Sequence, residues 1–416
     1  MQRFFYNLSI RLMIPGFYLA SLFHAKARKW VEGRKSLPSL PPAAGKTAWF
    51  HCASVGEFEQ ARPVLEAFRE KYPGWRIVLT FFSPSGYELR KQYDQADYVL
   101  YMPADTPAKA RQFLDAIRPD LVFWVKYEFW YHHLAELRRR GIPAILFSAI
   151  FRPDQIFFKS NGGFYREILE CFTHLFVQNR QSQELLKTIG FENVTTLGDT
   201  RFDRVLEIAE QARTIEIAER FAAGRRVLIG GSLWPEDWEV LREADLPGQG
   251  IRLILAPHEI NPAQIRKWMT ETPYRAVRYS ETTPETVADA DILWIDNVGM
   301  LASLYRYGQY AFIGGGYKDG LHNILEAAVW GMPVFFGNKK YRKFQEALDL
   351  LEAGSAHAVA DARAFRQIFD ELSAPGDRLA REAQISRDYV REQRGATAAI
   401  LAWTETHLMN KHWQKD

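Results

Sequence analysis

Short apolar segments rich in valine, isoleucine and phenylalanine recur along the chain, and polar segments with helical periodicity separate them. The first series of apolar segments lies at 48–54, 76–83, 98–103, 121–128, 143–150 and 174–179. A second series follows at 226–231, 252–257, 291–296, 310–314 and 332–336. Strands that helices cover on both faces are apolar throughout, so this alternation predicts parallel sheets of the α/β class. Two such series predict two doubly wound, Rossmann-like domains that face each other across a cleft.

The predicted domain limits follow the breaks between these series, because a chain of 416 residues is too long for one ordinary core. A proline-rich stretch at 37–42 opens the first domain, which we predict at 37–210. A charged stretch separates it from the second domain, predicted at 211–395. Residues 1–36 are predicted to form a separate N-terminal helix. Residues 396–416 are predicted to form a C-terminal helix that packs back on the first domain.

The N-terminal segment is apolar from Phe4 to Phe23, but Arg11 and other polar residues interrupt it. Basic residues follow the apolar run instead of preceding it, which is not typical of a cleaved signal peptide. An arginine near the middle of a span costs roughly 2.5 kcal/mol or more at the bilayer centre. We therefore predict a helix in the membrane interface, with Lys26, Arg28 and Lys29 facing anionic headgroups. The alternative is an amphipathic helix packed on the protein's own surface.

Composition excludes several other classes of protein. The net charge of +3 is too small to predict a nucleic-acid partner, and we expect none. Two cysteines, Cys52 and Cys171, make no disulfide or metal framework, and no His/Cys cluster has zinc spacing, so we expect no metal site. Aromatic residues make up 14% of the chain, which suits both core packing and stacking on sugars.

The loop after the first strand carries a candidate general base. Its residues Ser54-Val-Gly56-Glu57 are typical of a capping box at a helix start. The same loop also lies at the carboxyl end of a parallel strand, where such sheets bind ligands. A positioned glutamate there can take the proton of a sugar hydroxyl, which is a poor nucleophile until it loses that proton. Both interpretations of Glu57 stay open at this point.

Two further loops of the first domain have polar side chains at strand ends. Ser83, Ser85 and the backbone of Gly86 lie at a helix start, where they can hydrogen-bond a sugar or phosphate. The alternative is a Pro-Gly turn with a serine cap. Glu128 follows the apolar run 121–125, where burial would raise the pKa of a carboxyl group. We predict an acid–base or sugar-binding role for Glu128, with a plain surface glutamate as the alternative.

A glycine-rich loop in the second domain predicts an anion site. Three consecutive glycines at 314–316 let backbone amides approach an anion without interference from a Cβ atom. The helix that follows offers its positive end to a phosphate. Glu326 can bind both ribose hydroxyls there, although Asn323-x-x-Glu326 also resembles a capping box. The spacing differs from the G-x-G-x-x-G dinucleotide fingerprint. Three loops that end other strands supply the remaining candidates, which are Ser232, His258 and Gly299.

Together these loops resemble the motifs of the Kdo (3-deoxy-D-manno-octulosonic acid) transferases, a glycosyltransferase family of the GT-B architecture. Ser54–Glu57 is similar to the family's S-V-G-E, and Ser83–Gly86 is similar to its T-P-T-G. The further matches keep the family's order: Tyr127–Trp130 with T-E-L-W, Gln178-Asn179 with Q-N, Gly198–Asp203 with G-x-x-K-F-D, and Gly314–Ala328 with G-G-S followed by H-N-x-L-E-A-A.

The resemblance implies an inverting transfer of Kdo from the donor substrate CMP-Kdo to a lipid A precursor (lipid IVA), without a metal or cofactor. It also implies work at the cytoplasmic face of the bacterial inner membrane, in lipopolysaccharide biosynthesis. By position, Glu57 is the implied general base and Glu128 supports the donor or acceptor Kdo, while Asn323 and Glu326 hold the CMP ribose. The implied acceptor-binding residues are Ser54, Gly56, Ser83, Ser85 and Gly86, and the other donor-binding residues are Ser232, His258, Gly299, Gly314, Gly315 and Gly316.

Two family arginines are missing or moved. The family's P-R-H-P-E-R stretch stands here as 256–259 without an arginine, and its A-R-L-S stands as 149–152, where the arginine comes last. His258, Lys318 and Lys339 are the candidates to replace the first of these arginines. Two other functions remain as alternatives: a GT-B enzyme that uses a UDP-sugar, and a non-catalytic protein that binds lipid A.

Overall fold

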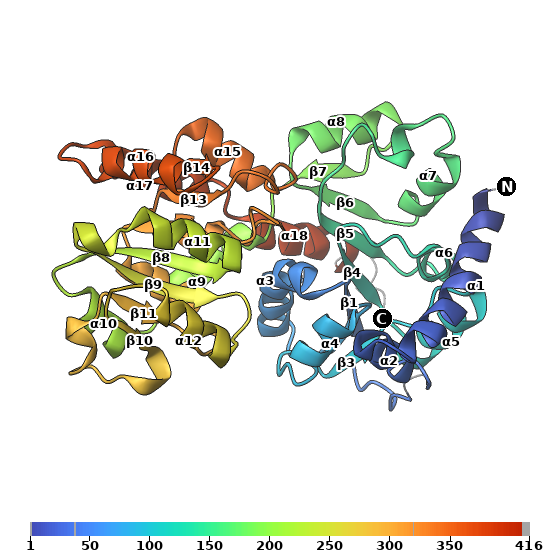
Figure 1. Cartoon of the computed structure of the whole chain (residues 1–416). Helices are drawn as coiled ribbons and strands as arrows, with labels where there is room; N and C mark the ends of the chain where they lie inside the picture. The colour runs from blue at the N-terminus through green and yellow to red at the C-terminus, as the bar shows by residue number, and fades with distance from the viewer. Residues whose placement is uncertain (1, 37–38, 319, 410–416) are drawn as a thin grey trace. The chain divides into compact units, whose positions relative to one another are not determined.

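The structure, a computed structural model, describes residues 2–36, 39–318 and 320–409. The chain divides into two compact units: the described residues up to Arg204 together with those from Arg394 onward, and Val205–Gln393. Each unit contains one seven-stranded parallel sheet with helices on both faces (Figure 1). Leu37-Pro38 of the predicted proline-rich break, Asp319 of the glycine loop and residues 410–416 of the predicted C-terminal helix lie outside the described residues.

The sheet of the first unit has the strand order β3-β2-β1-β4-β5-β6-β7. Side chains alternate between its two faces: Trp49 and Trp124 belong to one core, while Phe50 and Phe123 stack in the other with ring centroids 4.5 Å apart. Both faces are buried, which explains why the strands are apolar throughout. The strands are β1 (Thr47–Cys52), β2 (Arg76–Phe81), β3 (Tyr98–Tyr101), β4 (Leu121–Val125), β5 (Ala144–Ala149), β6 (His174–Val177) and β7 (Val194–Thr196).

The helices of the first unit cover these two cores. The core of Trp49 lies under α5 (Pro107–Ile117), α6 (Tyr131–Arg139), α7 (Gly163–Leu169) and α8 (Arg180–Thr188). The core of Phe50 lies under α3 (Val55–Lys71), α4 (Pro84–Arg90) and α18 (Ala396–Thr404), and α9 (Arg201–Glu210) leads toward the second unit. Short helical turns connect elements in both units: Ile156–Phe158, Pro247–Gln249, Tyr279–Glu281, Val287–Asp289, Tyr305–Tyr307 and Glu405–Met409.

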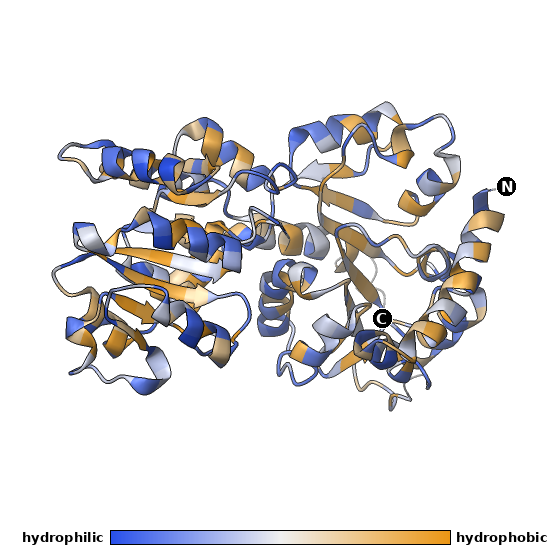
Figure 2. Cartoon of the chain, in the orientation of Figure 1, coloured by the Kyte–Doolittle hydropathy of each residue, from blue (hydrophilic) through white to orange (hydrophobic). Residues whose placement is uncertain are grey.

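The sheet of the second unit has the strand order β10-β11-β9-β8-β12-β13-β14. Figure 2 shows that the strands of both sheets are predominantly hydrophobic. The strands are β8 (Arg226–Leu233), β9 (Ile251–Pro257), β10 (Ala276–Arg278), β11 (Ile292–Trp294), β12 (Tyr310–Ile313), β13 (Val334–Gly337) and β14 (Ala356–Val359). The helices are α10 (Glu216–Ala222), α11 (Pro235–Ala244), α12 (Pro262–Thr270), α13 (Leu301–Leu304), α14 (Leu325–Ala328), α15 (Gln345–Ala353), α16 (Ala362–Ser373) and α17 (Arg378–Glu392).

Each sheet has a central point where the strand order changes direction. In the first sheet it lies between β1 and β4, and in the second between β8 and β12. Open parallel sheets bind ligands at the carboxyl ends of the strands at such a point. The loops after β1 and β4, and those after β8 and β12, are therefore the places to look for function in each unit.

The predicted strands are all present, with ends that differ by a few residues. Three observed strands, β7, β10 and β14, were not predicted. All three are edge strands of three or four residues that are only partly buried. An edge strand with exposed positions has no continuous apolar run, so the pattern that marks a central strand is missing.

The N-terminal segment forms two helices, α1 (Gln2–Ser21) and α2 (Ala25–Glu32). One face of α1 packs on the first unit through Tyr6, Ile10 and Phe17. Phe17 stacks on Trp30 of α2 with ring centroids 4.0 Å apart. None of the helices that the structure describes is long and apolar enough to cross a membrane.

Candidate functional site

Glu57 caps the helix that follows β1. Ser54 is the N-cap residue of α3, and the Glu57 Oε2 atom accepts hydrogen bonds from the Ser54 backbone N–H at 3.1 Å and from its hydroxyl at 2.5 Å. The Oε1 atom of Glu57 has no hydrogen-bond partner among the described residues, and the side chain is half-buried. The capping geometry thus fixes one carboxylate oxygen and leaves the other free at the carboxyl end of β1. Gly56 is exposed in the same loop.

Glu128 lies at the same change of strand order, in the loop after β4. Its Oε2 atom lies 3.0 Å from the Nε2 atom of His51 and accepts a hydrogen bond from the Trp130 indole at 2.9 Å. The side chain of Glu128 is 21% exposed, while His51 beneath it is fully buried in β1. A buried histidine and a half-buried tryptophan therefore hold one Glu128 oxygen, and part of the side chain faces solvent.

A chain of buried hydrogen bonds sets the tautomer of His51. Thr80 Oγ1 accepts a hydrogen bond from the Trp49 indole N–H at 2.8 Å and lies 2.8 Å from His51 Nδ1. Burial lowers the pKa of His51, although Glu128 opposes this change, so the ring is neutral at neutral pH. The Thr80 hydroxyl then donates to Nδ1, and Nε2–H donates to Glu128.

Ser83, Ser85 and Gly86 follow β2 and lie beside the loop after β1. The Ser83 N–H donates to the Ala53 carbonyl at 2.8 Å, and the Ser83 and Ser85 hydroxyls are hydrogen-bonded to each other at 2.8 Å. Gly86 is buried, and a Cβ atom added there would lie 2.5 Å from the Phe81 ring. The glycine at this position thus allows close packing of α4 on β2, and the two serines carry the exposed polar groups.

The motif at 198–203 forms a buried polar centre of the first unit. Asp199 accepts hydrogen bonds from Gln60 at 2.7 Å, Gln178 at 2.8 Å and the Arg201 side chain at 3.0 Å. Burial alone would raise the pKa of Asp199, but Arg201 and other donors hold it below its usual value. These motif residues hold the ends of β6 and β7 together. Arg152, the shifted arginine, lies near Tyr127 and opposes the rise in the pKa of that phenol that burial causes.

The three glycines of the second unit pack against neighbouring backbone. A Cβ atom added to Gly314 would lie 2.1 Å from the Ser232 carbonyl oxygen. A Cβ atom added to Gly315 would lie 2.2 Å from the Gly320 carbonyl oxygen, and one added to Gly316 would lie 2.5 Å from the Gly337 carbonyl oxygen. The Gly314 N–H donates to the Gly231 carbonyl, and the Gly315 N–H donates to Asp237. Two of the three amides are therefore already used inside the protein, and the glycines bring the ends of β8, β12 and β13 close together.

Asp237 lies buried beneath this loop at the start of α11. Its Oδ2 atom accepts hydrogen bonds from the backbone N–H groups of Trp234 at 2.9 Å and Gly315 at 3.0 Å. Its Oδ1 atom has no partner among the described residues. Burial raises the pKa of Asp237 to about 6, and the two backbone donors oppose that rise. Asp237 was not predicted as a site residue, since a carboxylate in a first helical turn is usually an exposed cap.

Three aromatic rings stack at the carboxyl edge of the second sheet. His258 lies between Trp234 and His322, with ring centroids 4.4 Å and 4.5 Å away. His258 is exposed and the other two rings are half-buried. Ser232, in the same loop as Trp234, has a left-handed φ of 54°, which is uncommon for a non-glycine residue and marks a locally constrained backbone. The stack joins predicted His258 with Trp234 and His322, which were not predicted.

The remaining predicted donor residues divide into two groups. The Asn323 amide donates to Glu326 at 3.1 Å, so these two side chains lie together next to the glycine loop. Gly299 lies in an exposed loop after β11, and a Cβ atom added there would meet no other atom within 4 Å. Of the two candidate lysines, Lys318 pairs with Glu236 at 3.5 Å and Lys339 is exposed.

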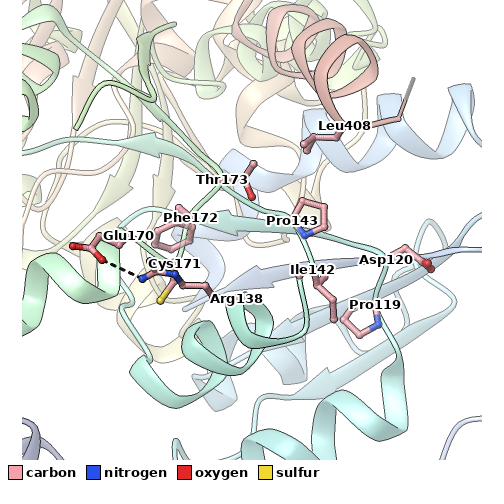
Figure 3. A pocket seen from close by; sticks show the side chains of 11 residues that line it. Pro119, Asp120, Arg138, Ile142, Pro143, Glu170, Cys171, Phe172, Thr173 and Leu408 are labelled. Atoms are coloured by element: carbon pink, nitrogen blue, oxygen red, sulfur yellow. Dashed lines mark hydrogen bonds and ion pairs between the residues drawn. The ribbon is translucent and has the colours of Figure 1, made fainter. Parts of the chain in front are cut away.

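A separate pocket of 550 Å³ lies at the other edge of the first sheet. Its lining includes Asp120, Pro143 and Thr173, which precede β4, β5 and β6 (Figure 3). It is thus at the amino ends of the strands, away from Glu57 and Glu128. Among residues 2–36, 39–318 and 320–409, no group of three His, Cys, Asp or Glu side chains is arranged to hold a metal ion.

Comparison with solved structures supports the fold. The UDP-GlcNAc 2-epimerase of Neisseria meningitidis, bound to UDP-GlcNAc, superimposes with a TM-score of 0.63 at 15% identity, over 87% of this chain and 100% of that chain. MurG of Acinetobacter baumannii gives a TM-score of 0.56 at 14% identity, over 87% and 99%. The predicted GT-B class, with two Rossmann-like parallel-sheet domains, is confirmed.

Comparison of sequences supports the resemblance to the Kdo transferases. Residues 27–204 match the family model described as 3-deoxy-D-manno-octulosonic-acid transferase (kdotransferase). The 3-deoxy-D-manno-octulosonic acid transferase of Aquifex aeolicus is 27% identical over 315 residues, which cover 74% of this chain and 80% of that protein. Its counterpart in Chlamydophila psittaci is 26% identical over 362 residues, which cover 82% and 80%. The motif-based resemblance to the Kdo transferase family of glycosyltransferases is confirmed, by the family model over 27–204 and by these relatives over most of the chain.

Proposed function

We propose that this protein transfers Kdo from CMP-Kdo to a lipid A precursor, with Glu57 as the general base. The observation that carries the proposal is the free Oε1 atom of Glu57 near the carboxyl end of β1, where the strand order of the first sheet changes direction. The relatives named above are called 3-deoxy-D-manno-octulosonic acid transferases, which supports Kdo as the transferred sugar.

Glu57 performs the proton transfer in this proposal. Oε2 stays bound to Ser54, and Oε1 accepts the proton of the acceptor hydroxyl. The hydroxyl oxygen bonds to the anomeric carbon of Kdo as the bond from that carbon to the CMP phosphate breaks, and the bonding electrons leave with CMP.

The second unit binds the CMP donor in this proposal. Asn323 and Glu326 take the ribose hydroxyls, for which two adjacent polar side chains are suited. Lys339 offers positive charge to the phosphate in place of the missing family arginine, and His258 offers a hydrogen-bond donor. Positive groups around a departing phosphate stabilise the charge that develops on it, so the donor can leave without a cofactor.

The membrane surface is the proposed working place, at the cytoplasmic face of the inner membrane. The acceptor is a lipid, and α1 and the turn that follows it expose large apolar side chains to solvent. These side chains are Phe4, Phe5, Leu8, Leu12, Leu19, Leu22 and Phe23. In an interfacial helix such side chains enter the acyl region while neighbouring Lys and Arg residues face the headgroups.

The test is mass spectrometry of a lipid A precursor after incubation with the protein and CMP-Kdo. We expect a mass increase of one or more Kdo residues, and no product when UDP-sugars replace CMP-Kdo. Turnover with UDP-sugars and none with CMP-Kdo would reject the proposal.

The variant Glu57→Gln tests the general base. Glutamine keeps the acceptor that caps α3 but cannot take the proton, so we expect transfer to fall about a hundredfold or more. Glu70→Gln is the matched control, because Glu70 is exposed near the other end of the same helix. Full activity in Glu57→Gln would remove Glu57 from the mechanism.

A further inference from the structure

A pocket of 300 Å³ lies against the inner side of α1, at the starts of α5 and α6. It is separate from the loops after β1 and β4, which carry Glu57 and Glu128. Its polar lining comes from α1, from α5 and the two residues before it, and from α6: Asn7, Arg11, Asp105, Thr106, Arg111 and His132.

Hydrogen bonds between α1 and the body of the unit fix the walls of this pocket. His132 Nε2 lies 2.7 Å from Asn7 Oδ1, and burial lowers the pKa of His132, so its neutral ring donates to the amide oxygen. Asn7 therefore keeps its NH₂ group as a donor. The Tyr6 hydroxyl donates to Asp105 and accepts from the Tyr131 backbone N–H at 3.1 Å. The pocket is thus preformed.

The charge of the pocket is positive. Arg11 and Arg111 are exposed, and neither guanidinium has an ion pair or hydrogen bond to another described residue. Asp105 is the opposing charge, but its oxygens already accept bonds from Tyr6, from the backbone of His132 and from His133. Two unpaired guanidiniums next to an amide donor suit a phosphate group, which arginine binds with two parallel hydrogen bonds.

The apolar face of α1 lies directly beside this pocket. At 3.6 residues per turn, Leu8, Leu12 and Leu19 share one side of the helix, and Tyr6 and Ile10 share the buried side. Arg11 falls between these two sides, with Asn7 next to it. Leu12 is 63% exposed and Phe23 is 77% exposed. A phosphate held by Arg11 would therefore sit at the depth of the headgroups when the apolar side enters the acyl region.

We propose that this pocket binds the phosphate of an anionic phospholipid headgroup. The inference rests on the proposed membrane location of α1, but it does not depend on the identity of the donor sugar or on Glu57. One lipid headgroup in the pocket would orient α1, and with it the first unit, on the bilayer. Diffuse attraction between basic residues and an anionic surface would not need a pocket.

The test measures binding of dihexanoyl phosphatidic acid, a short-chain lipid used below its micelle concentration, to the full-length protein by titration calorimetry. We expect saturable binding to wild type and a loss of about tenfold or more in Arg11→Gln/Arg111→Gln, because two charge-assisted contacts disappear. Ala108→Phe fills the pocket without changing its charge, and we expect a similar loss. Lys35→Gln/Lys187→Gln is the matched control, since it removes two exposed charges of the first unit outside the pocket. The control is expected to change affinity less than twofold.

Three results would overturn the inference. One is equal loss in the pocket and control variants, which would show diffuse attraction. Another is the absence of saturable binding by wild type. The third is equal or tighter binding of inorganic phosphate, which would make a free anion the ligand. Circular dichroism and melting temperatures check that each variant is folded. Kdo transfer by wild type to a detergent-dispersed acceptor separates failure of this inference from failure of the proposed function.

Discussion

At the scale of single residues, the least replaceable group near Glu128 is the hydroxyl of Thr80. It links the indole of Trp49 to the ring of His51, and that ring holds Glu128. Thr80→Val keeps the shape of the side chain but leaves the Trp49 N–H and His51 Nδ1 unpaired in a fully buried place. We expect a loss of about 1–3 kcal/mol in the free energy of unfolding for each unpaired group.

Urea denaturation measures this loss, and transfer rates show whether Glu128 needs its support. Thr80→Ser is the control, because it keeps the hydroxyl and should lose only the contribution of one methyl group, about 1 kcal/mol. If Thr80→Val and Thr80→Ser were equally stable, the hydroxyl would have no part in holding His51.

The raised pKa of Asp237 predicts that the stability of the protein depends on pH. Burial raises its pKa to about 6, while an unfolded aspartate titrates near 4. Between these values the folded state binds more protons than the unfolded state, so stability falls as pH rises from about 4 to about 6. Relative to Asp237→Asn, wild type should lose roughly 2 kcal/mol of unfolding free energy between pH 4 and pH 7. Urea titrations of both proteins at several pH values measure this difference, and parallel pH curves would contradict it.

The sequence identified the polar residues at strand ends but not the buried residues that hold them. Glu57 stands out through its capping-box motif after a predicted strand, and Glu128 because it follows an apolar run. His51 and Thr80 lie within the strands, where sequence alone does not tell which face a side chain takes or what it meets there. Trp234 was part of a singled-out loop, yet its stacking on His258 depends on a contact between separate loops.

At the scale of elements, Asp203 supplies the cap of α18 from a distant part of the chain. Its oxygens accept the Gly395 N–H at 2.6 Å and the Thr397 N–H at 2.7 Å. α18 in turn buries Ile400 and Leu401 in a core of the first unit. Asp203→Ala should destabilise the docking of α18 by about 0.5–2 kcal/mol, the usual contribution of an N-cap.

Hydrogen exchange of the amides at 396–404 measures that docking. Asp203→Asn keeps one acceptor for the two N–H groups, so its protection should fall between wild type and Asp203→Ala. Unchanged protection in Asp203→Ala would mean that packing of Ile400 and Leu401 alone holds the helix. The family motif ending in Asp203 would then need another explanation.

The strands show which elements a single sequence can reveal. Central strands such as β4 and β12 are buried on both faces, and their apolar runs predict them directly. The edge strands β7, β10 and β14 are three or four residues long and partly exposed. Their pairing with a neighbour defines them, and a neighbour is a property of the fold that no local pattern contains.

At the scale of the whole molecule, the two units have separate hydrophobic cores. The core of Trp238, Trp268 and Trp294 is built from the second unit alone, and the cores of Trp49 and Phe50 from the first. A ligand that binds one unit should therefore stabilise that unit first. CMP at a hundred times its dissociation constant adds about 2.7 kcal/mol to the stability of the state that binds it.

We expect this stabilisation within 205–393 when hydrogen exchange is followed with and without CMP. Protection should be greatest around Ser232, His258 and the segment 314–326, because the strand order changes direction between β8 and β12. UMP is the matched control, since it has the same ribose and phosphate and differs in the base. Equal protection by UMP would mean that the second unit does not distinguish cytosine, and protection by UDP but not CMP would favour a UDP-sugar donor. Protection confined to the first unit would place the nucleotide site there, and would contradict the proposal that the second unit binds CMP.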